Sequence, residues 1–290
     1  MKNKYALTTI IGLIGGVACV GIAIAESGNL SLFINIPSLL IIVGGTAFAL
    51  VMSYPLSTLK TLGSVIKQAF IENTDDLIED INTIAELSEV SRRDGLLALE
   101  SYAENSNDLF LKKGLNLLVD GNTREYLEDS MVSEIYHAQK RHRNGASMVS
   151  LIATLAPGLG LVGTYVGLIP MLVHMTDPDS LGPMMAIELV SSFYGGFLAN
   201  VIFSPMAKKL MAKSAQEKDR SDLILEGILA IHDGKSPRLI REDLLTYLTK
   251  QEAAKLPRSK QKAPAEEHAG GKVIDYKNKA KQSKAEQRGA

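Results

Sequence analysis

Four long apolar blocks, almost free of charge, constrain the fold of this chain more than any other feature of its sequence. They lie at about residues 5–25, 33–54, 148–175 and 183–205, and Glu188 is the only Asp, Glu, Lys or Arg within them. The hydrocarbon core of a bilayer is about 30 Å thick, and a helix needs about 20 residues to cross it. We therefore expect four transmembrane helices.

The first block has a second interpretation. Lys2 and Lys4 precede it and the small residues Ala23 and Ala25 end it, as in a secretory signal peptide with its cleavage site. The block is longer than the usual signal core, however, and the second block follows only a few residues later. A retained membrane span is the favoured interpretation.

The positive residues are placed unevenly around the four blocks. Residues 26–32 and 176–182 contain no Lys or Arg, so these two connections are expected to lie outside the cell. The other connections and the ends of the chain carry the positive residues, namely Lys2, Lys4, Lys60, Lys67, Lys140, Arg141, Arg143, Lys208, Lys209 and Lys213. We therefore expect a multi-pass protein with both termini in the cytoplasm.

The charged segments between and after the blocks have the apolar spacing of helices. Residues 75–87 and 109–118 show it, with Asp75 or Asp76 as a possible cap, and residues 123–143 are expected to run on into the third block. No segment alternates as a strand does. The sequence predicts an all-α membrane protein with four transmembrane helices, a large helical cytoplasmic insert between spans two and three, and a cytoplasmic C-terminal helix plus disordered tail.

Five regions follow from this pattern. The expected boundaries are spans one and two over 1–54, a cytoplasmic helical domain over 55–147, spans three and four over 148–205, cytoplasmic helices over 206–250 and a basic tail over 251–290. The fourth span is expected to continue as a helix over 207–232, and a further helix to begin at Ser236. The tail has almost no large apolar residues, so we expect it to be disordered. It is either solvated, which its composition favours, or in contact with anionic membrane lipid.

Composition and motif spacing argue against several classes of function. The net charge of −1 lacks the basic excess of a nucleic-acid-binding protein. Cys19 is the only cysteine, the five histidines are scattered, and no Ser/His/Asp grouping or Walker loop is present. Residues 158–163 have the spacing of a dinucleotide fingerprint, but they lie in a membrane block and not between a strand and a helix. We expect no catalytic residues, no metal site, no bound cofactor and no enzyme.

Small residues recur along the third and fourth blocks and predict close helix packing. Gly160, Gly163 or Thr164, and Gly167 share a face of the third span. The fourth span has two such series, Ser191-Gly195-Ala199 and Ser192-Gly196-Asn200. Either series can pack within this chain or against another helix. Glu188 is expected about one and a half turns from the outer end of its span, where it can reach the interface, so a carboxylate for ion passage would come from a partner.

The chain resembles the MotA/PomA family of flagellar stator subunits over about residues 5–250. The motifs that carry the resemblance are TLAPGLGLVGTYVGLIPML (154–172), DPDSLGPMMA (177–186), SSFYGGFLANVIFSPMAKKL (191–210), INIPSLLIIVGGT (34–46), SRRDGLLALE (91–100) and GILAIHDGKSPRLI (227–240). The resemblance implies a protein of the bacterial inner membrane that forms a five-membered ring around a MotB/PomB-type single-span, peptidoglycan-binding subunit. It also implies that ion flow turns the ring against the rotor protein FliG.

The resemblance also assigns roles to residues. The torque-linked charges fall on Arg92 and Glu100, with Arg93 as a weaker third member. Arg92 and Glu100 are eight residues apart, so on one helix they can share a face, with Leu96, Leu97 and Leu99 directed inward. The two prolines that couple ion flow to movement fall on Pro157 and Pro205. For Pro205, simple termination of span four is the alternative.

The transported ion is Na+ or H+, and the residues favour sodium. Thr164 matches a threonine of sodium-type members, although its hydroxyl can also bond to its own helix. Ser192 keeps a hydroxyl where the family has threonine, whereas Asn35 replaces the usual aspartate. The alternatives are an ExbB/TolQ-type energising subunit, whose relatives usually have three spans, and a membrane scaffold that conducts nothing.

Overall fold

The computed structural model describes residues 4–26, 28, 33–72, 77–173 and 178–249. All of them belong to the unit formed by residues 1–253. The expected tail over 251–290 and the expected cap at Asp75 or Asp76 lie outside the described residues.

Four helices of the described chain are long and apolar enough to cross a membrane, as predicted. The first span is α1. The second span is formed by α2, η2 and α3 together. The third is the apolar half of α9, and α10 with η4 forms the fourth. Their bounds are Leu7–Glu26 for α1, Ile36–Leu39 for α2, Leu40–Gly44 for η2, Gly45–Ser53 for α3, Arg124–Val173 for α9, Pro178–Phe197 for α10 and Leu198–Phe203 for η4. Both η2 and η4 are π-helical segments.

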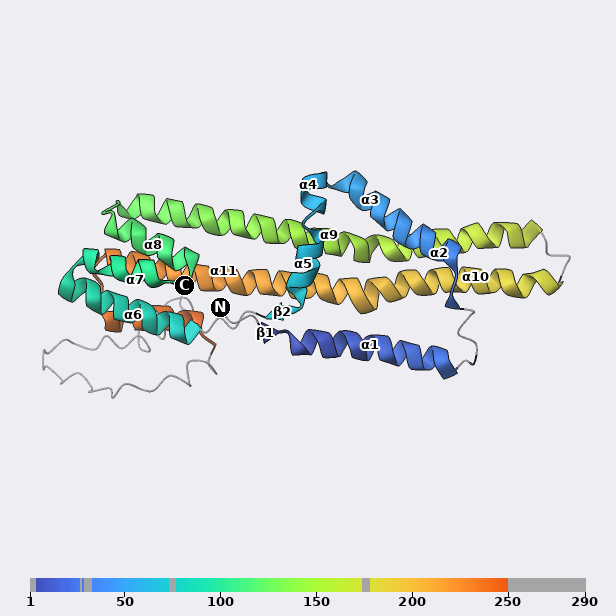
Figure 1. Ribbon diagram of the computed structural model, residues 1–290, viewed down its shortest axis with the longest axis horizontal. Coiled ribbons are helices and arrows are strands. Elements are labelled where there is room, and N and C mark those ends of the chain that lie inside the picture. Colours follow the sequence, from blue (N-terminus) through green and yellow to red (C-terminus); the bar gives the residue numbers. More distant parts are fainter. Residues whose placement is uncertain (1–3, 27, 29–32, 73–76, 174–177, 250–290) are drawn as a thin grey trace, which may run out of the picture. The chain divides into compact units, whose positions relative to one another are not determined.

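Two of these helices continue far beyond their apolar blocks, which confirms the sequence prediction. α9 runs without a break from its charged half into its apolar half, and α11 (Ser204–His232) follows η4 directly. Figure 1 shows α9 lying alongside α10 and α11 over most of its length. Gly234, with φ of 70°, follows α11, and the Ser236 side chain caps α12 (Pro237–Leu244), as predicted. A short η5 (Leu245–Tyr247) follows α12.

The insert between spans two and three is helical and has its own apolar core. Its helices are α4 (Leu56–Leu59), α5 (Leu62–Ala69), α6 (Leu77–Asp94), η3 (Leu96–Leu99), α7 (Glu100–Asn105) and α8 (Leu109–Val119). The core joins α6 and α8 to the charged halves of α9 and α11. Its fully buried side chains include Ile81, Ile84, Leu87, Leu115, Leu118, Leu127, Met131, Leu223, Ile224 and Ile228. Burial of this apolar surface is the main force that holds the insert against α9 and α11.

The segment around Arg92 differs from the prediction of one continuing helix. α6 ends at Asp94, and Gly95 has φ of 87° and ψ of 166°, a region that only glycine adopts readily. The chain therefore turns before η3 and α7, so Arg92 and Glu100 lie on different elements. The expectation for Leu97 was also wrong, because the turn directs this side chain outward with 72% of its surface exposed, whereas Leu99 is fully buried.

Two short strands are present that the sequence did not predict. β1 (Lys4–Tyr5) pairs antiparallel with β2 (Ile71–Glu72). The Ala6 amide donates a further hydrogen bond of 2.9 Å to the Phe70 carbonyl. Strands of two residues are too short to leave an alternating pattern, and the fold remains all-α. Their pairing puts the start of α1 and the end of α5 on the same side of the spans.

Candidate functional site

The apolar half of α9 and the α10 helix approach each other closely along a seam of small residues. A Cβ atom added to Gly195 would lie 2.5 Å from the Ala156 carbonyl oxygen, and one added to Gly160 would lie 2.9 Å from the Ser191 carbonyl oxygen. Side chains larger than hydrogen would push these two backbones apart. The series Ser191-Gly195-Ala199 therefore packs within this chain.

A hydrogen-bonded cluster fastens α2 to one side of α10. Ser191 Oγ donates a hydrogen bond of 2.5 Å to Ser38 Oγ, which in turn donates one of 2.8 Å to Asn35 Oδ1. Asn35 also caps α2 by accepting a bond of 2.9 Å from the Ser38 amide. The Tyr194 hydroxyl donates to the Phe33 carbonyl and accepts from the Asn35 amide. Asn35 therefore has a structural role, and neither Ser38 nor Tyr194 was singled out from the sequence.

The second small-residue series of the fourth span has no partner within the described chain. Ser192 and Asn200 are exposed, and nothing lies within 4 Å of a Cβ atom added to Gly196. Neighbouring positions on a helix are about 100° apart, so Ser192 points away from the side on which Ser191 contacts α2. Of the two predicted packing series, only one is used inside this chain.

Thr164 and Pro157 lie on the side of α9 that corresponds to the Ser192 side of α10. The opposite side of α9 is occupied by the second span, because Leu159 packs against Gly45 and against Ile42. Helical spacing puts Thr164 and Pro157 away from that contact. Thr164 is half-buried, and its hydroxyl donates a bond of 2.5 Å to the Leu161 carbonyl of its own helix. Thr164 and Ser192 thus face the same side of the α9–α10 pair, away from α2 and α3.

The two prolines are accommodated inside continuous helices. Pro157 lies within α9, where it removes a backbone donor from the helix interior. Pro205 is the second residue of α11, directly after the π-helical η4. Pro205 does not end the helix, which continues to His232. Wide π-helical turns occur often at functional positions of helices.

Glu188 is buried within the described part of the chain. α10 begins at Pro178, five residues before the apolar block, so Glu188 is ten residues from the helix start. Only 8% of its surface is exposed, and Oε1 is enclosed without a hydrogen-bond partner among the described residues. It fills space that Gly167 leaves open, because a Cβ atom there would lie 2.8 Å from Glu188 Cγ. Glu188 therefore packs against α9 and is not exposed on the surface of the described chain.

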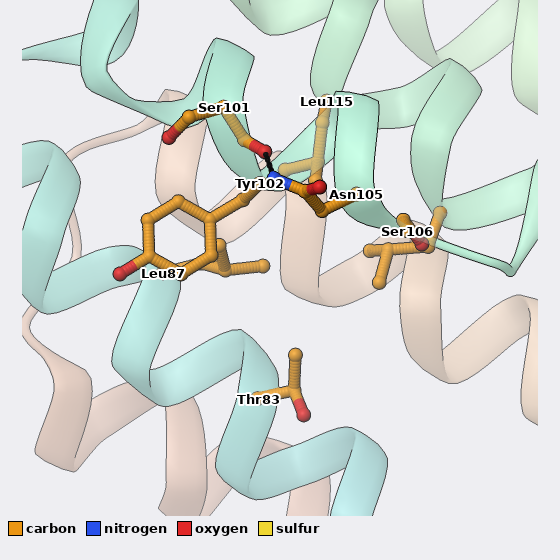
Figure 2. Close-up of a pocket in the computed structure, with 8 residues that line it drawn as sticks. Thr83, Leu87, Ser101, Tyr102, Asn105, Ser106 and Leu115 are labelled. Carbon is orange, nitrogen blue, oxygen red and sulfur yellow. Dashed lines mark hydrogen bonds between the residues drawn. The ribbon is translucent and has the colours of Figure 1, made fainter.

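The three charged residues assigned from the resemblance are exposed on the insert between spans two and three. Arg93 forms an ion pair of 2.8 Å with Asp94, and this hydrogen bond raises the pKa of Arg93 and lowers that of Asp94. Arg92 and Glu100 form no ion pair with any described residue. Figure 2 shows a hollow whose lining includes Ser101 and Tyr102 of α7 and Leu87 of α6. Its volume is about 480 Å³.

A partly buried ion-pair network, which the sequence did not predict, joins the insert to α11. Arg220 donates hydrogen bonds of 2.6 and 2.9 Å to Asp80 and forms a contact of 2.6 Å with Asp108, which caps α8. Burial alone would lower the pKa of Arg220, but the hydrogen bond to Asp80 and both negative charges raise it. The partners are more than a hundred residues from Arg220 in sequence, so no local pattern could have revealed them.

No group of three or more His, Cys, Asp or Glu side chains in the described part of the chain is arranged to hold a metal ion. The site residues are hydroxyls, prolines and isolated charges. Such an arrangement can line an ion path and transmit movement.

Comparison with known proteins agrees with this arrangement. Residues 102–223 match the model of the MotA/TolQ/ExbB proton channel family. The chain is 36% identical over 248 residues to Chemotaxis protein PomA of Vibrio alginolyticus, which covers 86% of this chain and 97% of the relative. It is 37% identical over 249 residues to Motility protein A of Cereibacter sphaeroides, with coverage of 86% and 98%.

The fold is also similar to solved structures. A chain of the flagellar MotAB stator complex from Bacillus subtilis superposes with a TM-score of 0.79 at 35% identity, over 85% of this chain and 97% of that chain. A chain of the C. jejuni MotAB structure superposes with a TM-score of 0.78 at 29% identity, over 84% and 96%. The predicted recognition and fold class are confirmed: this chain is a multi-pass membrane protein that belongs to the MotA/PomA flagellar stator subunits of the MotA/TolQ/ExbB proton channel family.

Proposed function

We propose that this chain is an ion-conducting stator subunit that converts a transmembrane cation gradient into torque on the flagellar rotor, with sodium favoured over protons. The observation that carries the proposal is the polar face of Thr164 and Ser192 on the side of α9 and α10 that the second span leaves open. The count of four spans, and the similarity to motility proteins over 86% of the chain, favour a motor subunit over an ExbB/TolQ-type energiser or a scaffold.

The open face fits a helix that brings its own carboxylate. Ser192, Gly196 and Asn200 form a smooth polar strip, and the described residues along this strip include no charged side chain. The partner is a MotB/PomB-type single-span subunit that binds peptidoglycan, in keeping with the MotAB complexes to which the chain is similar. Thr164 and Ser192 line the path between the two proteins. Exposed apolar residues such as Ile11 and Ile169 contact lipid or neighbouring copies in a ring of five.

The prolines and the exposed charges transmit movement in this mechanism. Pro157 and Pro205 weaken the backbone hydrogen bonding of the third and fourth spans, so ion binding on the polar face can bend these helices. Because α9 and α11 continue into the cytoplasm without a break, a bend in the membrane moves the insert. Arg92, Arg93 and Glu100 then act on charged groups of the rotor protein FliG.

The proposed orientation is multi-pass in the bacterial inner membrane, with both termini in the cytoplasm. Pairing of β1 with β2 supports this orientation, since it keeps the start of α1 beside the insert. The proposed functional regions are those expected from the sequence, namely 1–54, 55–147, 148–205, 206–250 and 251–290.

Swimming speed against external sodium at fixed pH tests the proposal. We expect speed to rise with sodium in cells that rely on this chain, and Thr164→Ala to weaken the sodium dependence. Thr154→Ala is the matched control, because Thr154 is an exposed threonine of the same helix and, like Thr164, donates to its own helix, with a bond of 2.9 Å to the Ser150 carbonyl. If swimming speed depends on pH and not on external sodium, the transported ion is the proton. Full motility without the single-span partner would contradict the mechanism.

A further inference from the structure

Glu188 is a carboxyl group inside the membrane part of the chain that the proposed ion path does not use. It lies on the face of α10 that packs against α9, three residues before Ser191 and therefore on the same face. Gly167 of α9 makes room for it, since any Cβ at position 167 would come within 2.8 Å of Glu188 Cγ. The side chain is held in the seam between the two helices.

The described residues that pack against the carboxyl group provide no compensating charge. Glu188 is 8% exposed, and its Oε1 has no hydrogen-bond partner among the described residues. α9 presents Gly163 and Gly167, which carry no ionisable group. The Ser38 hydroxyl of α2, which contacts α10 at Ser191, is bonded to Asn35 and Ser191. Burying an unpaired carboxylate is costly, and ionisable groups inside a membrane protein mark sites that bind protons or ions.

The ligands beside Glu188 distinguish a proton from a metal cation. Sodium needs several oxygen ligands in place of its water shell. Gly167 of α9 has no side chain to offer one, and a Cβ atom there would lie 2.8 Å from Glu188 Cγ and 3.7 Å from Oε1. Ser191 Oγ, the hydroxyl one turn along the same face, already donates to Ser38. A proton needs no additional space, because it adds to the carboxylate and forms a carboxylic acid without breaking another bond.

We propose that Glu188 is a proton-binding site within this chain, separate from the carboxylate that a partner helix brings to the ion path. The neutral acid packs against Gly167. Loss of the proton leaves a charge in the seam and drives the side chain away from α9, so the proton controls how closely α9 and α10 pack. Binding of the proton does not depend on the proposed motor function, whereas its effect on motility does.

Infrared difference spectroscopy of the purified, lipid-embedded assembly tests the site directly. The wild-type protein is compared with Glu188→Gln, which keeps the shape of the side chain, and with the control Glu86→Gln, which changes an exposed glutamate of α6. We expect a carboxylic-acid band at the higher frequency typical of an acid without strong hydrogen bonds. It should vanish in Glu188→Gln and remain in Glu86→Gln. If Glu188→Gln removes only a band of the hydrated type that Glu86→Gln removes, the proposal is wrong.

Two further measurements keep the test decisive. Sodium added at fixed pH should leave the band unchanged. If sodium abolishes the band, Glu188 binds sodium and the proposal of a proton-binding site is wrong. If Glu188→Gln fails to assemble, Gly167→Ala provides a second test, because the added methyl group should displace the carboxyl group and shift the band. An unshifted band in an assembled Gly167→Ala protein would show that Glu188 does not occupy the seam. Wild-type swimming in sodium remains a separate readout of the proposed motor function.

Discussion

Ser191 of α10 donates a hydrogen bond of 2.5 Å to Ser38 of α2, whereas the next residue, Ser192, points to the open side of the same helix. Two chemically identical neighbours therefore have different environments. Ser191 holds the second span in place, and Ser192 is available to an ion or to another helix. This division explains how one helix can be packed tightly on one side and still present a polar surface on the other.

The two serines should respond differently to the loss of the hydroxyl. Ser191→Ala removes a buried hydrogen bond and should lower the stability of the assembly by about 1 kcal/mol, with little change in ion dependence. Ser192→Ala should leave stability unchanged and alter the dependence of swimming speed on sodium. Thermal melting and swimming assays on both variants check this, and equal effects on either readout would contradict the division of roles.

The adjacent glycines of α10 provide a second matched pair. Gly195→Ala would place a methyl group 2.5 Å from the Ala156 carbonyl, so α9 and α10 must separate. Overpacking of this kind typically costs about 1–3 kcal/mol, and we expect a lower melting temperature and a lower yield of assembled protein. Gly196→Ala meets nothing within 4 Å and should leave the melting of the chain unchanged while weakening co-purification of the single-span partner. Similar melting temperatures for the two variants would contradict the close packing of α9 and α10 at Gly195.

The turn at Gly95 should be sensitive to any side chain. Its φ of 87° places an alanine in a strained conformation, so Gly95→Ala should lower stability by about 1–3 kcal/mol and reduce torque by displacing Arg92 relative to Glu100. Gly63→Ala is the control, because Gly63 also has open space around it but lies in a regular helix. There alanine should be neutral or stabilising by up to about 1 kcal/mol. Unfolding curves and the torque of single motors measure both effects.

Charge reversal at the insert tests the rotor contact. Arg92→Glu or Glu100→Lys should reduce torque while membrane insertion, assembly and ion conductance are retained, because both side chains are exposed and unpaired within the described chain. Glu125→Lys, at the start of α9, makes the same change of charge as Glu100→Lys at another exposed position and should leave torque unchanged. Loss of assembly in the first two variants would show that these residues are structural.

The contact between His142 and Glu217 should make stability depend on pH. Burial alone would raise the pKa of Glu217, but the hydrogen bond from His142 at 3.0 Å and the charges of His142 and Lys213 lower it below the ordinary value of 4.5. A lowered carboxyl pKa gives stabilisation that is complete above the pKa of the unfolded chain and is lost as the pH falls through that of the folded chain.

His142→Gln should remove this stabilisation. Because both side chains are partly exposed, we expect a loss of about 1 kcal/mol at roughly pH 5.5, where a carboxyl group is ionised and an imidazole is largely charged, and this loss should shrink towards more acid pH. Melting temperatures of wild type and variant from roughly pH 3.5 to 7 test the prediction. A difference that does not change with pH would show that the contact acts through packing and not through charge.

The sequence predicted the spans and the continuous helices because these depend on patterns along the chain. Lack of charge over 21 residues identifies the first span, and Gly234 and Ser236 mark a helix end and a helix start where the structure has them. The prediction failed where one residue changed the direction of the chain. Leu97 has the spacing of a core residue, but the turn at Gly95 directs it outward. The β1–β2 pair was not predicted because a strand of two residues is too short to show an alternating pattern.

What the sequence by itself determined is the set of membrane helices and the small and hydroxyl-bearing residues available to them, since hydropathy and helical spacing are local properties. The tertiary structure alone decided which residue meets which partner. Ser38 and Ser191 are 153 positions apart, and Arg220 meets Asp80 across 140. Only the packed helices show that Ser192 remains open and that Glu188 is buried against Gly167. The side of a helix that becomes covered depends on contacts with distant segments, and local spacing carries no information about them.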